Sequence, residues 1–123
     1  MVNLPQGFRG AGVASGIKSS GARDLALIVN DGPSRFGAAV FTSNKVVAAP
    51  VTWSQQVVKD NEVSAVVLNS GGANACTGPD GFADTHKTAE HVAKVLGVNA
   101  GDVVVCSTGL IGTRLPMPEL LSG

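Results

Sequence analysis

Two apolar runs separated by a long amphipathic segment constrain the fold of this chain most. The runs cover residues 63–68 and 103–105, and both are rich in valine, whose β-branched side chain favours extended backbone. Between them, residues 79–96 carry apolar side chains at helical spacing, namely Phe82, Ala89, Val92, Ala93 and Leu96. A strand, a helix and a strand in this order predict two parallel strands joined by a right-handed crossover.

A polar, glycine-containing segment follows each of these strands, at residues 69–78 and 106–112. Because the carboxyl ends of parallel strands lie at the same edge of a sheet, we expect the two segments to meet where α/β proteins usually bind ligands. Gly109 and Gly112 permit backbone angles that a side chain would forbid. The second segment can therefore present the Thr108 hydroxyl and nearby N–H groups to a developing negative charge, as an oxyanion hole does. The alternative is a tight strand-to-helix connection that needs only small residues.

The first segment, residues 69–78, lies between a strand and a helix and superficially resembles a phosphate-binding loop. It has neither the GxGxxG nor the GxxxxGK[ST] spacing, so the pattern does not indicate nucleotide binding. Asn69 and Asn74 are typical of residues that hold a turn by hydrogen bonds to their own backbone. Binding of an anion at the following helix N-terminus stays open as an alternative.

The rest of the chain predicts a mixed sheet with helices packed on it, an α/β fold in a single domain over residues 1–123. We expect a glycine-rich edge strand at 7–13 and an antiparallel pair formed by two apolar runs within 24–42. A short helix is predicted at 51–59, with Trp53 packed in the core. Residues 113–121 predict the opening of a further helix, with Pro116 and Pro118 tolerated only in its first turn.

Composition excludes several classes of function. Nine basic and nine acidic residues cancel, which argues against a nucleic-acid partner, and no apolar run approaches the length that spans a membrane. The first residues show no secretory leader pattern, so we expect a cytoplasmic protein in which Cys76 and Cys106 are reduced. His86 and His91 are five residues apart, which is not the spacing of a helical metal pair, and we expect both at the surface. Charged residues make up only 15% of the chain, which indicates a surface covered by a partner chain or by a missing remainder of the protein.

Five segments together resemble the ornithine acetyltransferase family, the bifunctional glutamate N-acetyltransferases of arginine biosynthesis, and look closest to actinobacterial members. They are residues 14–18 (Ala-Ser-Gly-Ile-Lys), 39–42 (Ala-Val-Phe-Thr), 69–78 (Asn-Ser-Gly-Gly-Ala-Asn-Ala-Cys-Thr-Gly), 106–112 (Cys-Ser-Thr-Gly-Leu-Ile-Gly) and 115–117 (Leu-Pro-Met). The resemblance implies a precursor that cuts itself into an alpha and a beta chain and frees a threonine at the new N-terminus. That threonine would carry acetyl from N2-acetylornithine to glutamate, with acetyl-CoA as a further donor in some members and no bound cofactor or metal.

For this sequence, the resemblance implies that Thr108, through its side chain, and Gly109, through its backbone N–H, form the oxyanion hole. It further implies that these 123 residues are the N-terminal part of an alpha chain, partnered by the beta chain in an alpha2-beta2 heterotetramer. The nucleophile and the substrate-binding residues would lie downstream of Gly123, so we expect the chain alone to be inactive. A self-processing aminopeptidase, a structural fragment and an anion-binding module are the alternatives.

Overall fold

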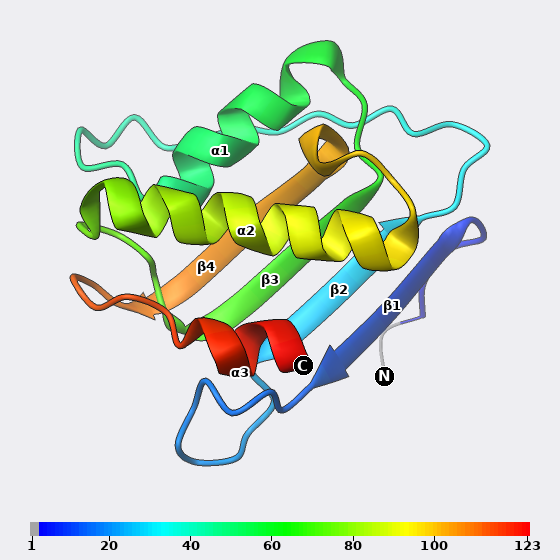
Figure 1. The fold of residues 1–123 in the computed structure, drawn as a ribbon. Coiled ribbons are helices and arrows are strands. Elements are labelled where there is room, and N and C mark those ends of the chain that lie inside the picture. Colours follow the sequence, from blue (N-terminus) through cyan, green and yellow to red (C-terminus); the bar gives the residue numbers. More distant parts are fainter. Residues whose placement is uncertain (1–2) are drawn as a thin grey trace.

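The computed structural model describes residues 3–123 and contains one four-stranded sheet in the order β1-β2-β3-β4 (Figure 1). The strands are β1 (Phe8–Val13), β2 (Leu25–Asn30), β3 (Ala65–Gly72) and β4 (Val103–Leu110). β1 and β3 both pair antiparallel with β2, whereas β3 and β4 are parallel. The predicted mixed sheet is therefore confirmed, and so is its parallel pair, whose two strands are connected by a helix.

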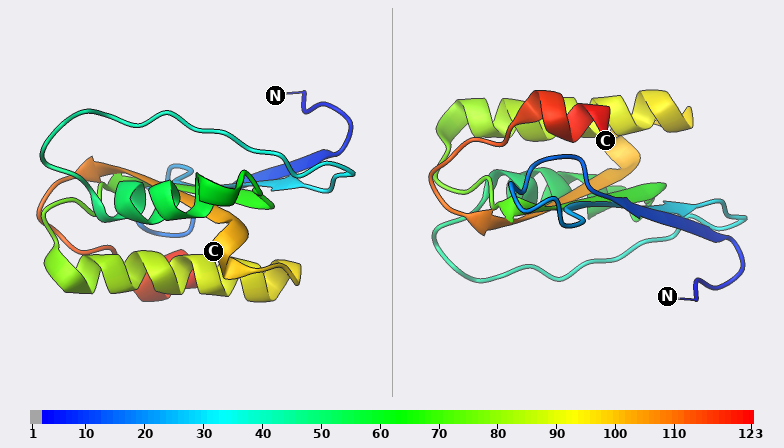
Figure 2. Two further views of the ribbon diagram at one scale, coloured as in Figure 1. Left: turned by 90° about the horizontal axis from the view of Figure 1, so that it is seen from above. Right: turned by 90° about the horizontal axis from the view of Figure 1, so that it is seen from below.

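Within residues 3–123, three α-helices accompany the sheet: α1 (Ala49–Val57), α2 (Gly78–Leu96) and α3 (Met117–Ser122). Short 3-10 turns follow α1 at Val58–Asp60 and precede β4 at Ala100–Asp102. α2 and α3 lie on one face of the sheet, while the long connection between β2 and α1 crosses the opposite face (Figure 2). Among residues 3–123, no helix combines the length and the apolar composition needed to cross a membrane.

The core lies between α2 and the two parallel strands. Its buried members are small or β-branched, which lets the helix approach the sheet closely: Ala65, Val67, Ala89, Ala93, Val103 and Val105. The predicted apolar stripe of the helix is confirmed at Ala89 and Ala93 but not at Phe82, which stays 39% exposed. In the first turns of α2, the polar residues Asp84 and Thr85 are buried instead.

α1 covers the free edge of β4, and two of its side chains bond to that edge. The indole N–H of Trp53 donates to the Val103 carbonyl at 2.9 Å. The Ser54 hydroxyl donates to the Val105 carbonyl at 2.8 Å and accepts the Val105 N–H at 3.1 Å. These bonds satisfy strand groups that an uncovered edge would leave to water or to another chain. Trp53 thus packs against the core, as predicted.

The antiparallel pair predicted within residues 24–42 is wrong. β2 forms where expected, but its partners are β1, which places Gly10 opposite Ile28, and β3. Both edges of β2 are therefore occupied. Residues 37–42 instead belong to the connection that crosses the far face of the sheet, where Gly37 donates its N–H to the Asn61 carbonyl at 2.8 Å. Val40 in this segment is 98% exposed, so its apolar character does not reflect a place in the sheet.

Both parallel strands run further than their apolar composition predicts. β3 begins at Ala65 rather than residue 63 and continues through the polar residues to Gly72, and β4 continues to Leu110. Thr108 and Gly109 accordingly lie within β4 and not in a turn after it. Strand pairing between the two segments replaces the apolar packing that ends at Val105, because each backbone supplies hydrogen bonds to the other.

Candidate functional site

The carboxyl ends of β3 and β4 come together, as the sequence predicts. Ser70 lies opposite Thr108 and Gly71 opposite Gly109, and beyond them the register shifts so that Gly72 pairs with both Thr108 and Leu110. Two further backbone bonds of 2.8 Å join the segments that follow, from the Ala73 N–H to the Leu110 carbonyl and from the Gly112 N–H to the Ala75 carbonyl. The two polar segments thus form one connected structure.

Thr108 and Gly109, the predicted oxyanion-hole residues, are both exposed at this end of the sheet. Gly109 has a φ of +132°, which L side chains rarely adopt. A Cβ on Gly109 would lie 2.6 Å from the carbonyl carbon of Gly71 and 2.6 Å from the nitrogen of Gly72. Glycine is therefore required at residue 109 by both backbone angle and space, and the exposed Thr108 directly precedes it in β4.

Asn69 holds the two strands together immediately before this point. Its side chain is buried, with its Oδ1 accepting the Ser107 hydroxyl at 2.5 Å and its Nδ2 donating to the Gly72 carbonyl at 3.1 Å. The predicted role of Asn69 in holding its own segment is confirmed. The bond to Ser107, 38 residues away, goes beyond that local role.

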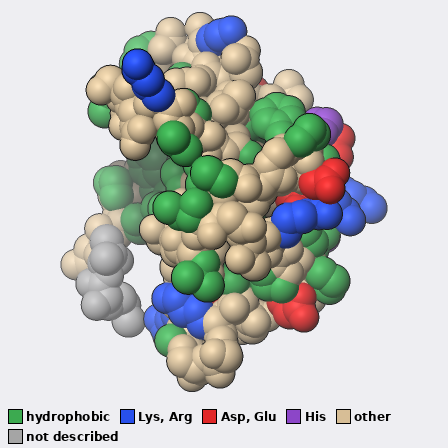
Figure 3. Space-filling model, turned by 90° about the vertical axis from the view of Figure 1, so that its left-hand side faces the viewer, with side chains coloured by type: hydrophobic (Ala, Val, Ile, Leu, Met, Phe, Trp, Pro, Cys, Tyr) green, Lys and Arg blue, Asp and Glu red, His purple; other side chains and the backbone are tan. Residues whose placement is uncertain are grey.

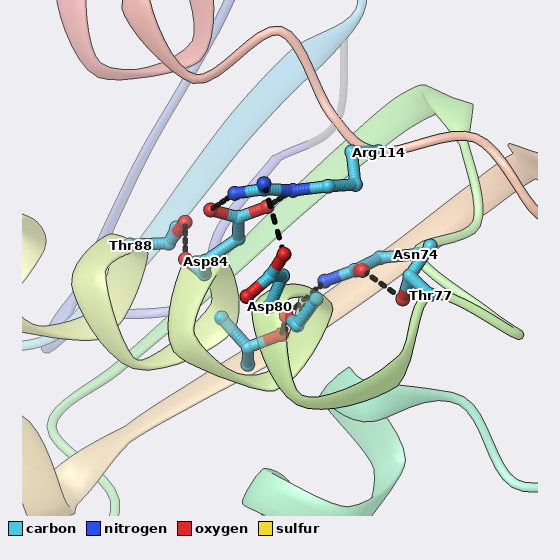
Figure 4. Close-up of polar contacts among 8 residues, drawn as sticks. Asn74, Thr77, Asp80, Asp84, Thr88 and Arg114 are labelled. Atoms are coloured by element: carbon cyan, nitrogen blue, oxygen red, sulfur yellow. Dashed lines mark hydrogen bonds and ion pairs between the residues drawn. The ribbon is translucent and has the colours of Figure 1, made fainter.

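Asn74 fixes the start of α2 and is completely buried. Its backbone has a φ of +49°. Its Nδ2 donates to the Gly81 carbonyl at 2.8 Å and to the Thr85 hydroxyl at 2.9 Å (Figure 4). Its Oδ1 accepts the Thr77 hydroxyl at 2.7 Å. Asn74 therefore holds its turn through the Thr77 hydroxyl and through α2, and not through the backbone of its own segment as predicted. The helix N-terminus beside it carries Asp80 in its first turn, a charge that opposes an incoming anion.

Arg114 ties the segment after β4 to α2 through a fork that local sequence spacing did not reveal (Figure 4). Its Nε and Nη2 donate to the two carboxylate oxygens of Asp84 at 2.9 and 2.8 Å, and its Nη1 lies 3.4 Å from Asp80. The Asp84 side chain is only 7% exposed, and its carboxylate raises the pKa of Arg114. Two aspartates on one helix face at i, i+4 are the only sequence signal for this contact, because the partner is 30 residues away.

Asp24 organises the loop between β1 and β2, which packs against the same end of the sheet. The buried carboxylate accepts the backbone N–H of Lys18 at 2.8 Å and both the N–H and the hydroxyl of Ser15 at 2.7 and 2.9 Å. These donors, the Lys18 N–H foremost, lower the pKa of Asp24 to about 2. The loop brings Ile17 and Lys18 against Gly71, where a Cβ would lie 2.8 and 3.3 Å from their side chains.

Figure 3 looks onto the side of the molecule toward which the arrow of β4 points in Figure 1. Hydrophobic side chains are spread over the middle of this face, and most of the acidic ones lie along one side of it. In the segment that leaves β4, Leu110 and Ile111 are each 69% exposed. The segment that follows Thr108 and Gly109 therefore carries exposed apolar side chains.

Two histidines and two cysteines are further candidate ligands in the sequence. His86 and His91 are exposed, as predicted, and the His86 ring packs against Trp53 at a 45° tilt, with 5.0 Å between the ring centroids. Cys76 and Cys106 are both free thiols, and burial raises the pKa of Cys106. Within residues 3–123, no group of three or more His, Cys, Asp or Glu side chains is arranged to hold a metal ion.

The structure as a whole matches that of an acetyltransferase. It superimposes on ornithine acetyltransferase from Mycobacterium tuberculosis, solved in complex with ornithine, with a TM-score of 0.96 and 63% identity. The match covers 97% of this chain and 64% of that one. The Bacillus halodurans arginine biosynthesis bifunctional protein argJ matches with a TM-score of 0.90 and 38% identity, over 96% of this chain and 61% of that one.

The chain belongs to the ArgJ family, whose family model matches residues 9–123. Arginine biosynthesis bifunctional protein ArgJ of Streptomyces coelicolor is 66% identical over 122 residues, and that of Thermobifida fusca is 65% identical over 122 residues. Both alignments cover 99% of this chain but only 32% of the relative. The chain thus spans about a third of the length of these relatives, and the family predicted from the sequence is confirmed.

Proposed function

We propose that this chain forms part of an ArgJ-type acyltransferase that moves acetyl from N2-acetylornithine to glutamate. The observation that carries the proposal is the family match over residues 9–123, together with 63% identity to an acetyltransferase solved with ornithine. The nucleophile we propose is a threonine in the remaining two thirds of an ArgJ protein. Self-cleavage would place it at the N-terminus of a beta chain, where its own amine can act as base.

In this proposal Thr108 and Gly109 stabilise the tetrahedral intermediates of acetyl transfer. The threonine oxygen attacks the acetyl carbonyl carbon, and the electron pair of the C=O bond moves onto the oxygen. The Thr108 hydroxyl and the Gly109 N–H donate to that oxyanion. Collapse expels the ornithine amine with a proton and leaves the acetyl group on the threonine. The glutamate amine then attacks the ester, and the same two donors serve the second intermediate. Its collapse breaks the bond to the threonine oxygen, which takes up the proton lost by the amine, and releases N-acetylglutamate.

Three features of this end of the sheet support the assignment. Gly109 is held against the Gly71–Gly72 peptide, so its backbone is fixed before substrate arrives. Thr108 is exposed and next to it in the strand. The surrounding turns are joined by two 2.8 Å backbone bonds and by the Arg114–Asp84 fork, which gives the pair a rigid support.

The proposal extends to assembly, location and donor. We propose that the chain pairs with the beta chain of the same precursor in an alpha2-beta2 heterotetramer in the cytoplasm. Acetyl-CoA is the second acetyl donor to assay. The low content of charged residues, 15%, supports a surface that is partly covered by the beta chain.

The test uses a chimera in which this chain replaces the matching third of the Streptomyces coelicolor protein, called the ArgJ chimera below. We expect it to appear as two chains on a denaturing gel and to transfer acetyl from N2-acetylornithine to glutamate, whereas the 123-residue chain alone transfers none. A processed chimera that releases acetate to water and makes no N-acetylglutamate would favour the aminopeptidase alternative. Transfer by the 123-residue chain alone would place the nucleophile within it and overturn the proposal.

A further inference from the structure

We infer that Asn69 is a positioning residue for acetyl transfer, acting through Thr108 and Gly109 without touching substrate. The inference rests on the proposed function of those two residues. Asn69 lies on β3, while the pair it serves lies on β4, and its amide spans the two strands at the point where their register shifts.

The row of side chains facing α2 changes character at Asn69. Along this face, Ala65 lies opposite Val103 and Val67 opposite Val105, and all four are buried and apolar. The next pair on the same face is Asn69 and Ser107, because side chains alternate between the faces of a strand. The pair after that, Gly71 and Gly109, has no side chains. Asn69 and Ser107 are thus the last cross-strand side-chain pair on this face before the oxyanion residues.

The two hydrogen bonds of Asn69 hold both sides of the shifted register. The 2.5 Å bond from the Ser107 hydroxyl fixes the residue just before Thr108. The 3.1 Å bond to the Gly72 carbonyl holds Gly72, whose nitrogen belongs to the peptide that Gly109 lies against. The Oδ1 and Nδ2 atoms of Asn69 are thus both hydrogen-bonded, and the residue is only 5% exposed. An apolar residue of the same size would fill this space equally well but would leave both strands free to shift.

The consequence for catalysis follows from how steeply rate depends on placement. A displacement of about 1 Å at a reacting centre costs about 100-fold in rate. Loss of the Asn69 bridge leaves the Gly72 carbonyl and the Ser107 hydroxyl without these partners and lets the Gly109 N–H move relative to Thr108. Because Asn69 does not touch substrate in this proposal, the loss falls on kcat and not on KM.

The experiment compares variants of the ArgJ chimera under one assay of acetyl transfer. Asn69→Leu removes both bonds at nearly constant volume, and Ser107→Ala removes one of them with less risk to folding. Ser54→Ala is the matched control, because it also removes two hydrogen bonds from buried β4 backbone, at Val105, but on the outer edge of the strand. Thr108→Val, alone and combined with Asn69→Leu, completes a double-mutant cycle. Thermal unfolding of each variant shows how much of it is folded at the assay temperature.

We expect Asn69→Leu to lower kcat by about tenfold or more, Ser107→Ala by less, and both to keep KM within about twofold. Added to Thr108→Val, the Asn69→Leu change should cost no more than about twofold further, since both act through the same donor pair. Ser54→Ala should lower the unfolding temperature and leave kcat within about twofold.

Unchanged kcat in folded Asn69→Leu and Ser107→Ala would overturn the inference. It would also be overturned if the fall in kcat of the double variant equalled the product of the falls caused by Asn69→Leu and Thr108→Val alone. If Asn69→Leu does not fold, the Ser107→Ala result decides. Failure of the underlying function looks different, because Thr108→Val itself would then transfer acetyl at the unsubstituted rate.

Discussion

The backbone of Gly109 lies against the backbone of Gly71 so closely that the space between them excludes a methyl group. A Cβ on Gly109 would lie 2.6 Å from the carbonyl carbon of Gly71 and 3.0 Å from its nitrogen. These are backbone atoms of a paired strand, which cannot rotate away as a side chain does. The contact therefore sets the distance between the ends of β3 and β4, and with it the position of the neighbouring Thr108.

Gly109→Ala should destabilise the 123-residue chain by about 2–5 kcal/mol, because overpacking adds to the strain of a positive φ. Gly112→Ala is the matched control: its φ is +83°, but nothing lies within 4 Å of an added Cβ. That variant should lose about 1–2 kcal/mol, from backbone strain alone. Urea unfolding followed by the fluorescence of Trp53, the single tryptophan, measures both. Equal losses in the two variants would show that the contact with Gly71 contributes nothing.

Arg114→Ala should destabilise the chain by about 1–3 kcal/mol, since it leaves the buried Asp84 carboxylate without its forked partner. Arg114→Lys should recover only part of this, because a single ammonium group cannot make two parallel bonds to one carboxylate. The control is Asp80→Asn, whose side chain is 75% exposed and should change stability by no more than about 0.5 kcal/mol. If Asp80→Asn were as damaging as Arg114→Ala, the assignment of Asp84 as the main partner would be wrong.

Asp24 should make the stability of the chain depend on acidic pH. Its pKa in the folded chain is about 2, against an ordinary value of 3.8, because the N–H groups of Lys18 and Ser15 donate to the charged form. Because the pKa is lower in the folded chain, the charged carboxylate stabilises the fold at every pH above the pKa of the unfolded chain. This contribution is lost as pH falls from about 4 toward 2. The stability difference between the unsubstituted chain and Asp24→Asn should therefore shrink over that interval. A difference that stays constant from pH 5 to pH 2 would contradict the role of the charge.

The spacing of apolar residues along the chain predicts the strand–helix–strand unit of the fold. The two valine-rich strands and the helix between them follow from side-chain spacing, and their parallel pairing follows from the handedness of such units. The convergence of the two polar segments, where Thr108 and Gly109 lie, then needs no further information. The same reasoning fails for residues 24–42, because two adjacent apolar runs also fit strands that pair with more distant segments.

Contacts between distant residues account for the features that the sequence did not reveal. Asp84 looks like a solvated helix residue until Arg114, 30 residues later, is folded onto it. The Asn69–Ser107 bond likewise depends on the register of β3 against β4, which spacing alone does not give. Extension of both strands through polar residues has the same origin, since each segment provides the hydrogen-bonding partner for the other.

The measurement that tests the central claim most directly is the kcat of acetyl transfer by the ArgJ chimera carrying Thr108→Val. Valine keeps the shape of threonine and removes its hydroxyl, so the variant deletes one oxyanion donor without opening a cavity. We predict a fall in kcat of about 100- to 1,000-fold, with substantial recovery in Thr108→Ser, which restores the hydroxyl. A Thr108→Val chimera that is folded, cut into two chains and as fast as the unsubstituted chimera would contradict the account.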